Sequence, residues 1–214
     1  MTTTRDKLIR ATQKALVEDG IAHLSARTTA ARAGVNQALV FYHFSTVSEL
    51  VEAAARAMAD DSVDYYRDRF AEVESLGGLL ALGQEVHERE RTTGNVAVMA
   101  QLMAGAQRDE VLARAARYAM DLWREQVERV VRRVVEPSPL ADVVDPAGLA
   151  RAIAAAFIGL ELYEGVDADG AGSALATLEQ LGVLVEVLDE LGPVARRAVR
   201  SRLRRGGRGR STAR

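Results

Sequence analysis

The sequence predicts an all-α fold in which three short helices precede a larger bundle of longer ones, about nine helices in all. Apolar residues recur three and four positions apart along most of the chain, and the alternation typical of strands is nearly absent. Capping residues and glycines stand where these periodic segments begin and end. The composition, 48% hydrophobic and 27% charged, is sufficient to bury a core of this kind.

The first three predicted helices are short and closely spaced. The first lies between the threonines at 2–4 and Gly20, which supplies a left-handed stop. The second and third span residues 26–33 and 37–44, and Gly34 separates them. A serine, threonine or asparagine precedes each helix and can cap it.

The later helices are longer. The fourth begins after Ser45 or Thr46 and continues towards Phe70, and Gly77 and Gly78 then interrupt the pattern. Prolines predict a loop over residues 136–146, and a glycine-rich stretch predicts another over 165–172. The five remaining helices are expected at residues 79–91, 95–106, 109–135, 147–164 and 173–191.

The net charge of −2 conceals strong zoning along the chain. Residues 1–47 contain six basic and three acidic side chains, and residues 192–214 contain nine arginines and no acidic residue. Residues 48–191 therefore carry a net charge of −14. We expect three parts: a basic head over 1–47, an acidic helical body over 48–191, and a basic, largely disordered tail over 192–214 that is a second candidate for contact with a polyanion.

The second and third predicted helices have the features of a helix-turn-helix unit, in which the second helix of the pair enters the major groove of DNA. Gln37 stands where its amide can pair with an adenine edge. Val40 and Phe44 are assigned, with Ala30 and Ala33, to a small core behind this helix. The residues expected to contact DNA, with Asn36 acting first as a cap, are Arg27, Asn36, Gln37, Ala38, Leu39, Tyr42 and His43.

The stretch GIAHLSARTTAARAGVNQALVFYHFSTVSEL, residues 20–50, resembles the DNA-binding domain of TetR-type repressors. Ten positions carry the resemblance, namely Gly20, Ser25, Arg27, Ala30, Ala33, Gly34, Val35, Gln37, His43 and Phe44. Three positions depart from the family pattern: Phe41 replaces the usual tyrosine, Val47 replaces a lysine, and Leu39 replaces a smaller residue.

The resemblance implies a homodimeric, ligand-responsive repressor that binds a palindromic double-stranded DNA operator and is released from it by a small-molecule effector. The long fourth helix, shared by head and body, is the natural lever between the two activities. The three departures leave an alternative open: a helical ligand- or partner-binding protein whose head no longer reads DNA.

The eighth and ninth predicted helices are apolar around more of their circumference than one covered face requires. We expect them to form a four-helix dimer interface with a second copy, although a helix sandwiched within one subunit has the same pattern. The expected interface residues are Phe157, Leu160, Leu178, Leu181, Val185 and Leu188.

An effector pocket is implied by the resemblance more than by the residues. Methionines and aromatic residues in the fifth to eighth helices provide flexible apolar surface, with Gln84, His87 and Gln101 as polar partners, but such a stripe also fits an ordinary core. The residues chosen for the pocket are Met99, Met103, Met120, Trp123 and Phe157.

Nothing in the sequence predicts an enzyme, a cofactor or a metal site. Cysteine is absent, and in HERER at 87–91 Arg91 stands where a zinc motif needs its second histidine. The longest uncharged apolar stretch, 152–160, is far shorter than the ~20 residues of a membrane span. We therefore expect a cytoplasmic protein without a membrane partner.

Overall fold

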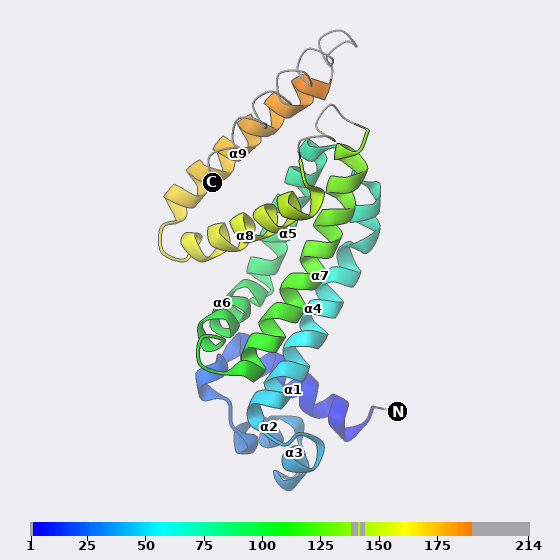
Figure 1. The fold of residues 1–214 in the computed structure, drawn as a ribbon. Helices are drawn as coiled ribbons and strands as arrows, with labels where there is room; N and C mark the ends of the chain where they lie inside the picture. Colours follow the sequence, from blue (N-terminus) through cyan, green and yellow to red (C-terminus); the bar gives the residue numbers. More distant parts are fainter. Residues whose placement is uncertain (1, 138–140, 142–143, 190–214) are drawn as a thin grey trace, which may run out of the picture. The chain divides into compact units, whose positions relative to one another are not determined.

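The computed structural model describes residues 2–137, 141 and 144–189, and within α9 it leaves the side chains of 178–179 and 181–189 undescribed. This part of the chain is helical and contains no strand, which confirms the predicted fold class (Figure 1). It comprises α1 (Thr4–Glu18), η1 (Ile21–His23), α2 (Ala26–Ala33), α3 (Ala38–His43), α4 (Val47–Glu72), α5 (Leu76–Thr92), α6 (Asn95–Gly105), α7 (Glu110–Val135), α8 (Pro146–Glu164) and α9 (Ala168–Asp189).

The chain divides into two compact units. The first contains Met1–Tyr66 and His87–Trp123, and the second contains Arg67–Val86 and the described residues from Arg124 onwards. The division falls within α4, α5 and α7, so each of these helices contributes to both units. The two units are defined by how their residues pack together, and neither ends at residue 47. The predicted boundary at that residue, between a DNA-binding and an effector-binding part, therefore stays a prediction.

The first unit has a small core around α3. Val40 is fully buried and Phe44 is 6% exposed, and they pack with residues of α1, α2 and α4: Leu8, Ala26, Ala30 and Leu50. Ala33 packs against this cluster from its edge. The role predicted for Val40, Phe44, Ala30 and Ala33 is therefore confirmed.

A second core in the same unit joins α1 and α4 to α6 and α7. Leu16, Val51, Val98 and Leu102 are among its buried members. Val47 is partly buried and packs against both cores, at the start of α4. This position explains why an apolar residue stands there in place of a lysine.

The ends of α1 and α2 are fixed by reciprocal caps. The Thr3 hydroxyl accepts a hydrogen bond from the Asp6 backbone N–H, and the Asp6 carboxylate accepts one from the Thr3 N–H. Ser25 and Thr28 form the same arrangement at α2. Gly34 ends α2 in the left-handed region, with φ +67° and ψ +36°. The caps thus fix where α1 and α2 begin, and Gly34 sets the turn between α2 and α3.

The second unit contains α8 and α9, which pack against each other, and the C-terminal ends of α4 and α7. Arg133 of α7 donates hydrogen bonds to the carbonyl oxygens of Phe70, at 2.7 Å, and Val73, at 2.7 and 3.0 Å. It thereby satisfies carbonyls at the end of α4 that have no partner within the helix.

Two predicted boundaries are wrong. The glycine pair does not break the chain before residue 79: α5 begins at Leu76, because the Ser75 hydroxyl accepts the Gly78 N–H at 2.9 Å and caps the helix. The loop predicted over 165–172 is also too long, since α9 begins at Ala168. There the Asp167 carboxylate accepts the Gly170 N–H at 2.9 Å. In both cases a side-chain cap offsets the low helix propensity of glycine.

The backbone at Gly34 can be tested by a Gly34→Ala substitution. No atom lies within 4 Å of an added Cβ, so the cost is the left-handed backbone alone, about 1–2 kcal/mol of unfolding free energy. Gly83→Ala is the matched control, because Gly83 lies inside α5 with equally open space for a Cβ and without a positive φ. This substitution should raise the unfolding free energy of the protein by about 1 kcal/mol. Urea unfolding measures both. Equal shifts of the same sign would contradict the assigned turn.

Candidate nucleic-acid interface

The short helix α3 presents one face to the core and the opposite face to solvent. Val40 and Phe44 are buried, whereas Gln37, Ala38, Phe41 and Tyr42 are exposed, with Phe41 at 54% and Tyr42 at 80%. Leu39 and His43 are half-buried at the sides. Because the buried pair fixes the rotation of the helix, the exposed side chains have a defined direction.

The turn into α3 is held by Asn36. Its side-chain oxygen accepts the Ala38 N–H at 2.9 Å, so this residue has the capping role that the sequence suggests. The Gln37 side chain makes no cap bond and is exposed at the start of the helix. The amide that is expected to read a base edge is therefore accessible.

The other predicted contact residues lie on the same α2–α3 unit. Arg27 is exposed in the first turn of α2. The Tyr42 and His43 rings meet edge to face, with centroids 5.0 Å apart. The structure thus brings all seven predicted residues onto the exposed or half-exposed surface of one helix-turn-helix unit, and their contact with DNA stays a prediction.

Two residues of this surface were not predicted. Phe41 is more than half exposed, although the sequence identifies it only as a replacement for the family's usual tyrosine, whose hydroxyl it lacks. Arg5 of α1 lies over the Phe44 ring, with its guanidinium carbon 5.2 Å from the ring centroid, and so stands at the end of α3. The two partners are far apart in sequence, and no local pattern indicates their contact.

The basic side chains of α1 and α2 fall into two groups, those that are exposed to solvent and one that forms ion pairs. Arg5, Lys7, Arg10 and Lys14 are exposed along α1. Arg32 of α2 forms ion pairs with Glu18 and, at 2.7 Å, with Asp19, which brace α2 against the end of α1. Arg32 therefore has a structural role, whereas the α1 cations are exposed to solvent, although Arg5 also lies over the Phe44 ring.

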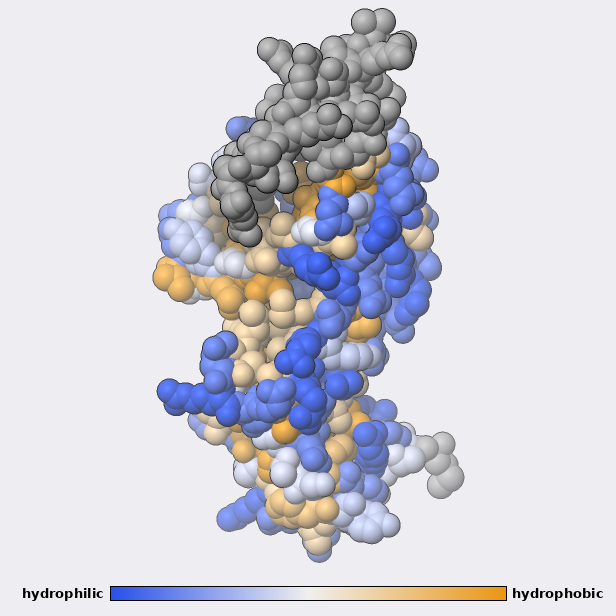
Figure 2. Space-filling model, viewed as in Figure 1, coloured by the Kyte–Doolittle hydropathy of each residue, from blue (hydrophilic) through white to orange (hydrophobic). Residues whose placement is uncertain are grey.

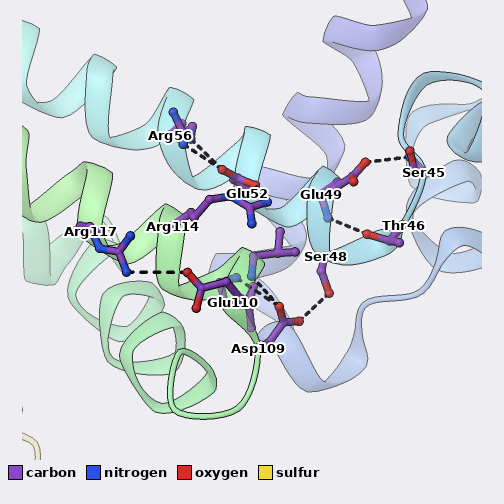
Figure 3. Close-up of polar contacts among 12 residues, drawn as sticks. Ser45, Thr46, Ser48, Glu49, Glu52, Arg56, Asp109, Glu110, Arg114 and Arg117 are labelled. Carbon is purple, nitrogen blue, oxygen red and sulfur yellow. Dashed lines mark hydrogen bonds and ion pairs between the residues drawn. The ribbon is translucent and has the colours of Figure 1, made fainter.

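The start of α4 is tied to the start of α7 by a polar network (Figure 3). The Ser48 hydroxyl donates to the Asp109 carboxylate at 2.8 Å, and Asp109 also accepts the Val111 N–H at 2.8 Å. One turn further along α4, Glu52 pairs with Arg56 at 2.8 Å and with Arg114 of α7 at 3.0 Å. The segment that follows α3 is thus anchored within the first unit.

The helix α6 also holds the α1–α2 junction. The Gln101 side-chain oxygen accepts the Ile21 N–H at 2.7 Å. Gly20, with φ +78°, leaves room for this contact, because a Cβ there would lie 2.8 Å from the same oxygen. The oxygen of Gln101 is thus bonded to the head, and the proposal that this residue is a polar partner for an effector stays a prediction that rests on its amide nitrogen.

The residues proposed for an effector pocket fall in both units. Met99, Met103, Met120 and Trp123 are half-buried on α6 and α7 of the first unit, and Phe157 is half-buried on α8 of the second. The Trp123 ring lies 5.9 Å from the ring of Tyr66, which is fully buried. Burial raises the pKa of the Tyr66 hydroxyl above its ordinary value, so this phenol is a neutral polar group beside the indole.

Exposed apolar residues form a stripe along α8. Ala152, Ala155, Ala156, Gly159, Leu162 and Tyr163 recur at helical spacing and are all exposed. Figure 2 shows a hydrophobic patch at the C-terminal end of this helix, where Leu162 and Val166 are exposed. Phe157 and Leu160 are half-buried beside the stripe, and the side chains of Leu178, Leu181, Val185 and Leu188 lie outside the described part.

Length and composition alone would allow α8 to cross a membrane. Within the described residues it is the one helix with this property, and 11% of its apolar window is buried. A single helix of this kind is weak evidence for a membrane span. The same numbers fit a helix whose exposed apolar face packs against another helix.

Comparison with known families gives one match. The model of the "Bacterial regulatory proteins, tetR family" matches residues 8–54, which contain most of α1, all of α2 and α3, and the start of α4. No curated protein matches the chain.

Solved structures share the fold over most of the chain. A TetR-family transcriptional regulator of Rhodococcus sp. has 22% identity and a TM-score of 0.69, covering 88% of this chain and 99% of its own. SCO7518 of Streptomyces coelicolor A3(2), described as a transcriptional regulator, has 21% identity and a TM-score of 0.66, with coverages of 84% and 98%. The multidrug binding protein EbrR, solved with imidazole, has 25% identity and a TM-score of 0.60, with coverages of 82% and 94%.

The anchor at Asp109 predicts a pH dependence of stability. The Ser48 hydroxyl, and then the backbone N–H groups of Val111 and Leu112, hold the pKa of Asp109 below its ordinary value of 3.8. The stabilisation is therefore complete above that value and is lost as the pH falls through the lower folded-state pKa. Asp109→Ala should lose about 1 kcal/mol of unfolding free energy at about pH 6, and this gap should narrow in acid.

Asp109→Asn is the matched control, because asparagine can cap a helix without titrating. The difference in unfolding free energy between the wild type and this variant gives the contribution of the negative charge of Asp109. This difference should shrink as the carboxylate becomes protonated. Urea unfolding across the acidic range measures it. A difference that stays constant down to about pH 3 would show that the charge contributes nothing.

Proposed function

This chain is a TetR-family transcriptional regulator, and we propose that it is a homodimeric repressor that binds a palindromic DNA operator and is released by a small-molecule effector. Regulators of this family are DNA-binding proteins without enzymatic activity. DNA regulation also agrees with a cytoplasmic location.

The observation that carries the proposal is the exposed face of α3. A six-residue helix whose buried side is fixed by Val40 and Phe44 presents Gln37 and Tyr42 outward, next to Arg27 of α2. This arrangement matches the geometry in which a recognition helix reads base edges while neighbouring basic residues meet phosphates. The cations of α1 add attraction for a polyanion.

Dimerisation is supported by the apolar stripe on α8. Its small residues permit close approach of another helix, and an exposed apolar stripe on a soluble protein marks an interaction surface. A second copy, related by a two-fold axis, presents an identical stripe, and α9 beside α8 extends the interface to four helices. Two recognition helices would then meet two half-sites of a palindrome.

Effector response is supported by the ties within the first unit. An effector among Met99, Met103, Met120 and Trp123 would act on α6 and α7, and these helices hold the head through Gln101 and Asp109. The long helix α4 serves as the lever, because it follows the head directly and its second residue, Ser48, bonds to Asp109. A coupling free energy of about 1–3 kcal/mol is typical of such responses.

Two substitutions separate base reading from phosphate attraction, once an operator has been selected from random DNA. Gln37→Ala should remove the preference for one base pair in each half-site, because a bidentate contact to the base is lost. The expected loss of discrimination against the other bases is about 1–3 kcal/mol. Arg27→Ala should weaken binding to all sequences and lower the salt slope by about one. Fluorescence anisotropy at several salt concentrations measures both.

Arg32→Ala is the control for these variants. Arg32 is engaged by Glu18 and Asp19, so its loss should reduce stability slightly and leave base preference and salt slope unchanged. Failure of the wild-type protein to enrich any sequence from the random pool would remove the proposed function itself.

The proposed interface can be tested with a pair of alanine-to-glutamate variants. Ala156 is exposed within the α8 stripe, and Ala81 is exposed on α5, outside this stripe. Ala156→Glu should shift the protein towards monomer, because it places an unpaired charge in an apolar contact, whereas Ala81→Glu should remain dimeric. Sedimentation equilibrium measures the mass of the wild-type protein and of each variant and so distinguishes monomer from dimer. A monomeric wild type at micromolar concentration would rule out the interface.

A further inference from the structure

We infer that Phe41 is a specificity-determining residue, whose ring contacts the 5-methyl group of a thymine in the major groove. This inference rests on the proposed function, because it concerns how the same DNA surface chooses its sequence. It assigns an attractive role to a position where the family resemblance indicated only a lost hydroxyl.

The direction of the ring follows from the packing of α3. Val40, immediately before Phe41, is fully buried, and Phe44 is 6% exposed. Phe41 is 54% exposed and stands one helical turn after the exposed Gln37, so both side chains project from the same face. A residue beside the base-reading Gln37 enters the groove with it.

The chemistry of the ring selects its contact. Phe41 is the one phenylalanine of the described chain that is classed as exposed, and it carries no group that could bond to a phosphate. In the major groove the apolar feature is the methyl group of thymine. The exposed Ala38 lies beside Phe41 on the helix and widens the apolar surface, and Figure 2 shows mildly hydrophobic surface where α3 lies.

The surroundings of the ring favour DNA over another occupant. Arg5, Lys7 and Arg27 are exposed on the helices that support α3, and Arg5 lies over the neighbouring Phe44. An apolar ring within a basic surface complements a polyanion that carries apolar groups in its groove. Duplex DNA has both features.

The experiment removes the methyl group and leaves the rest of the site unchanged. An operator is first selected from random DNA with the wild-type protein. Each thymine is then replaced in turn by deoxyuridine, and affinity is measured by fluorescence anisotropy. One thymine per half-site should be sensitive, with a loss of about 4-fold for each methyl group, as for any buried methyl-sized apolar group.

The variants assign that loss to Phe41. Phe41→Ala should bind the thymine and deoxyuridine operators equally, whereas Phe41→Leu should keep part of the difference. Because the ring is largely exposed, both variants should retain the wild-type melting temperature. Tyr42→Phe is the matched control on the same helix, and whatever its effect on affinity, the ratio between the two operators should not change.

The outcomes are distinguishable. If the protein binds its selected operator but no deoxyuridine substitution weakens binding, the inference about Phe41 fails and the proposed function stands. The same holds if the methyl dependence persists in Phe41→Ala. If no DNA sequence is selected, the proposed function fails, and binding of the wild-type protein, but not of Phe41→Ala, to anionic lipid vesicles would assign the ring to a membrane surface.

Discussion

The burial of Val40 and Phe44 is the constraint on which the DNA-binding surface depends. A six-residue helix has too few backbone hydrogen bonds to be stable in water by itself. Its position comes from Leu8, Ala26, Ala30 and Leu50, which belong to three other helices. Any change that loosens this core releases Gln37, Phe41 and Tyr42 together, because one packed face orients all of them.

The same packing joins the head to the rest of the first unit. Val47 contributes to both cores, and polar ties from Gln101 and Asp109 reach the α1–α2 junction and the start of α4. Two of these three contacts, at Val47 and Ser48, lie at the start of α4, and the third, between Gln101 and Ile21, bypasses this helix. A signal that moves α6 or α7 would reach the head through side chains as well as along the lever helix.

Local features made much of this arrangement predictable. The bounds of α2, the left-handed turn at Gly34 and the small core behind α3 follow from caps and apolar spacing within about twenty residues. The predicted starts of α5 and α9 were wrong, because glycines near each start normally disfavour a helix. Here Ser75 and Asp167 cap these helices by accepting the backbone N–H groups of Gly78 and Gly170. The contact of Gln101 with Ile21 was not predicted, because it joins residues 80 positions apart. Contacts of that kind, like Arg5 over Phe44, require the tertiary fold before they can be recognised.

The departures from the family pattern can now be weighed against the alternative of a head that no longer reads DNA. Val47 replaces a lysine at a place where two apolar cores meet, so its side chain has a packing role that a charged residue would fill less well. Phe41 replaces a tyrosine and exposes an apolar ring that costs free energy in water unless a partner covers it. The four exposed cations of α1 remain to meet phosphates. Val47 is therefore explained by packing, and the exposed ring of Phe41 agrees with the contact to an apolar group of the groove inferred above.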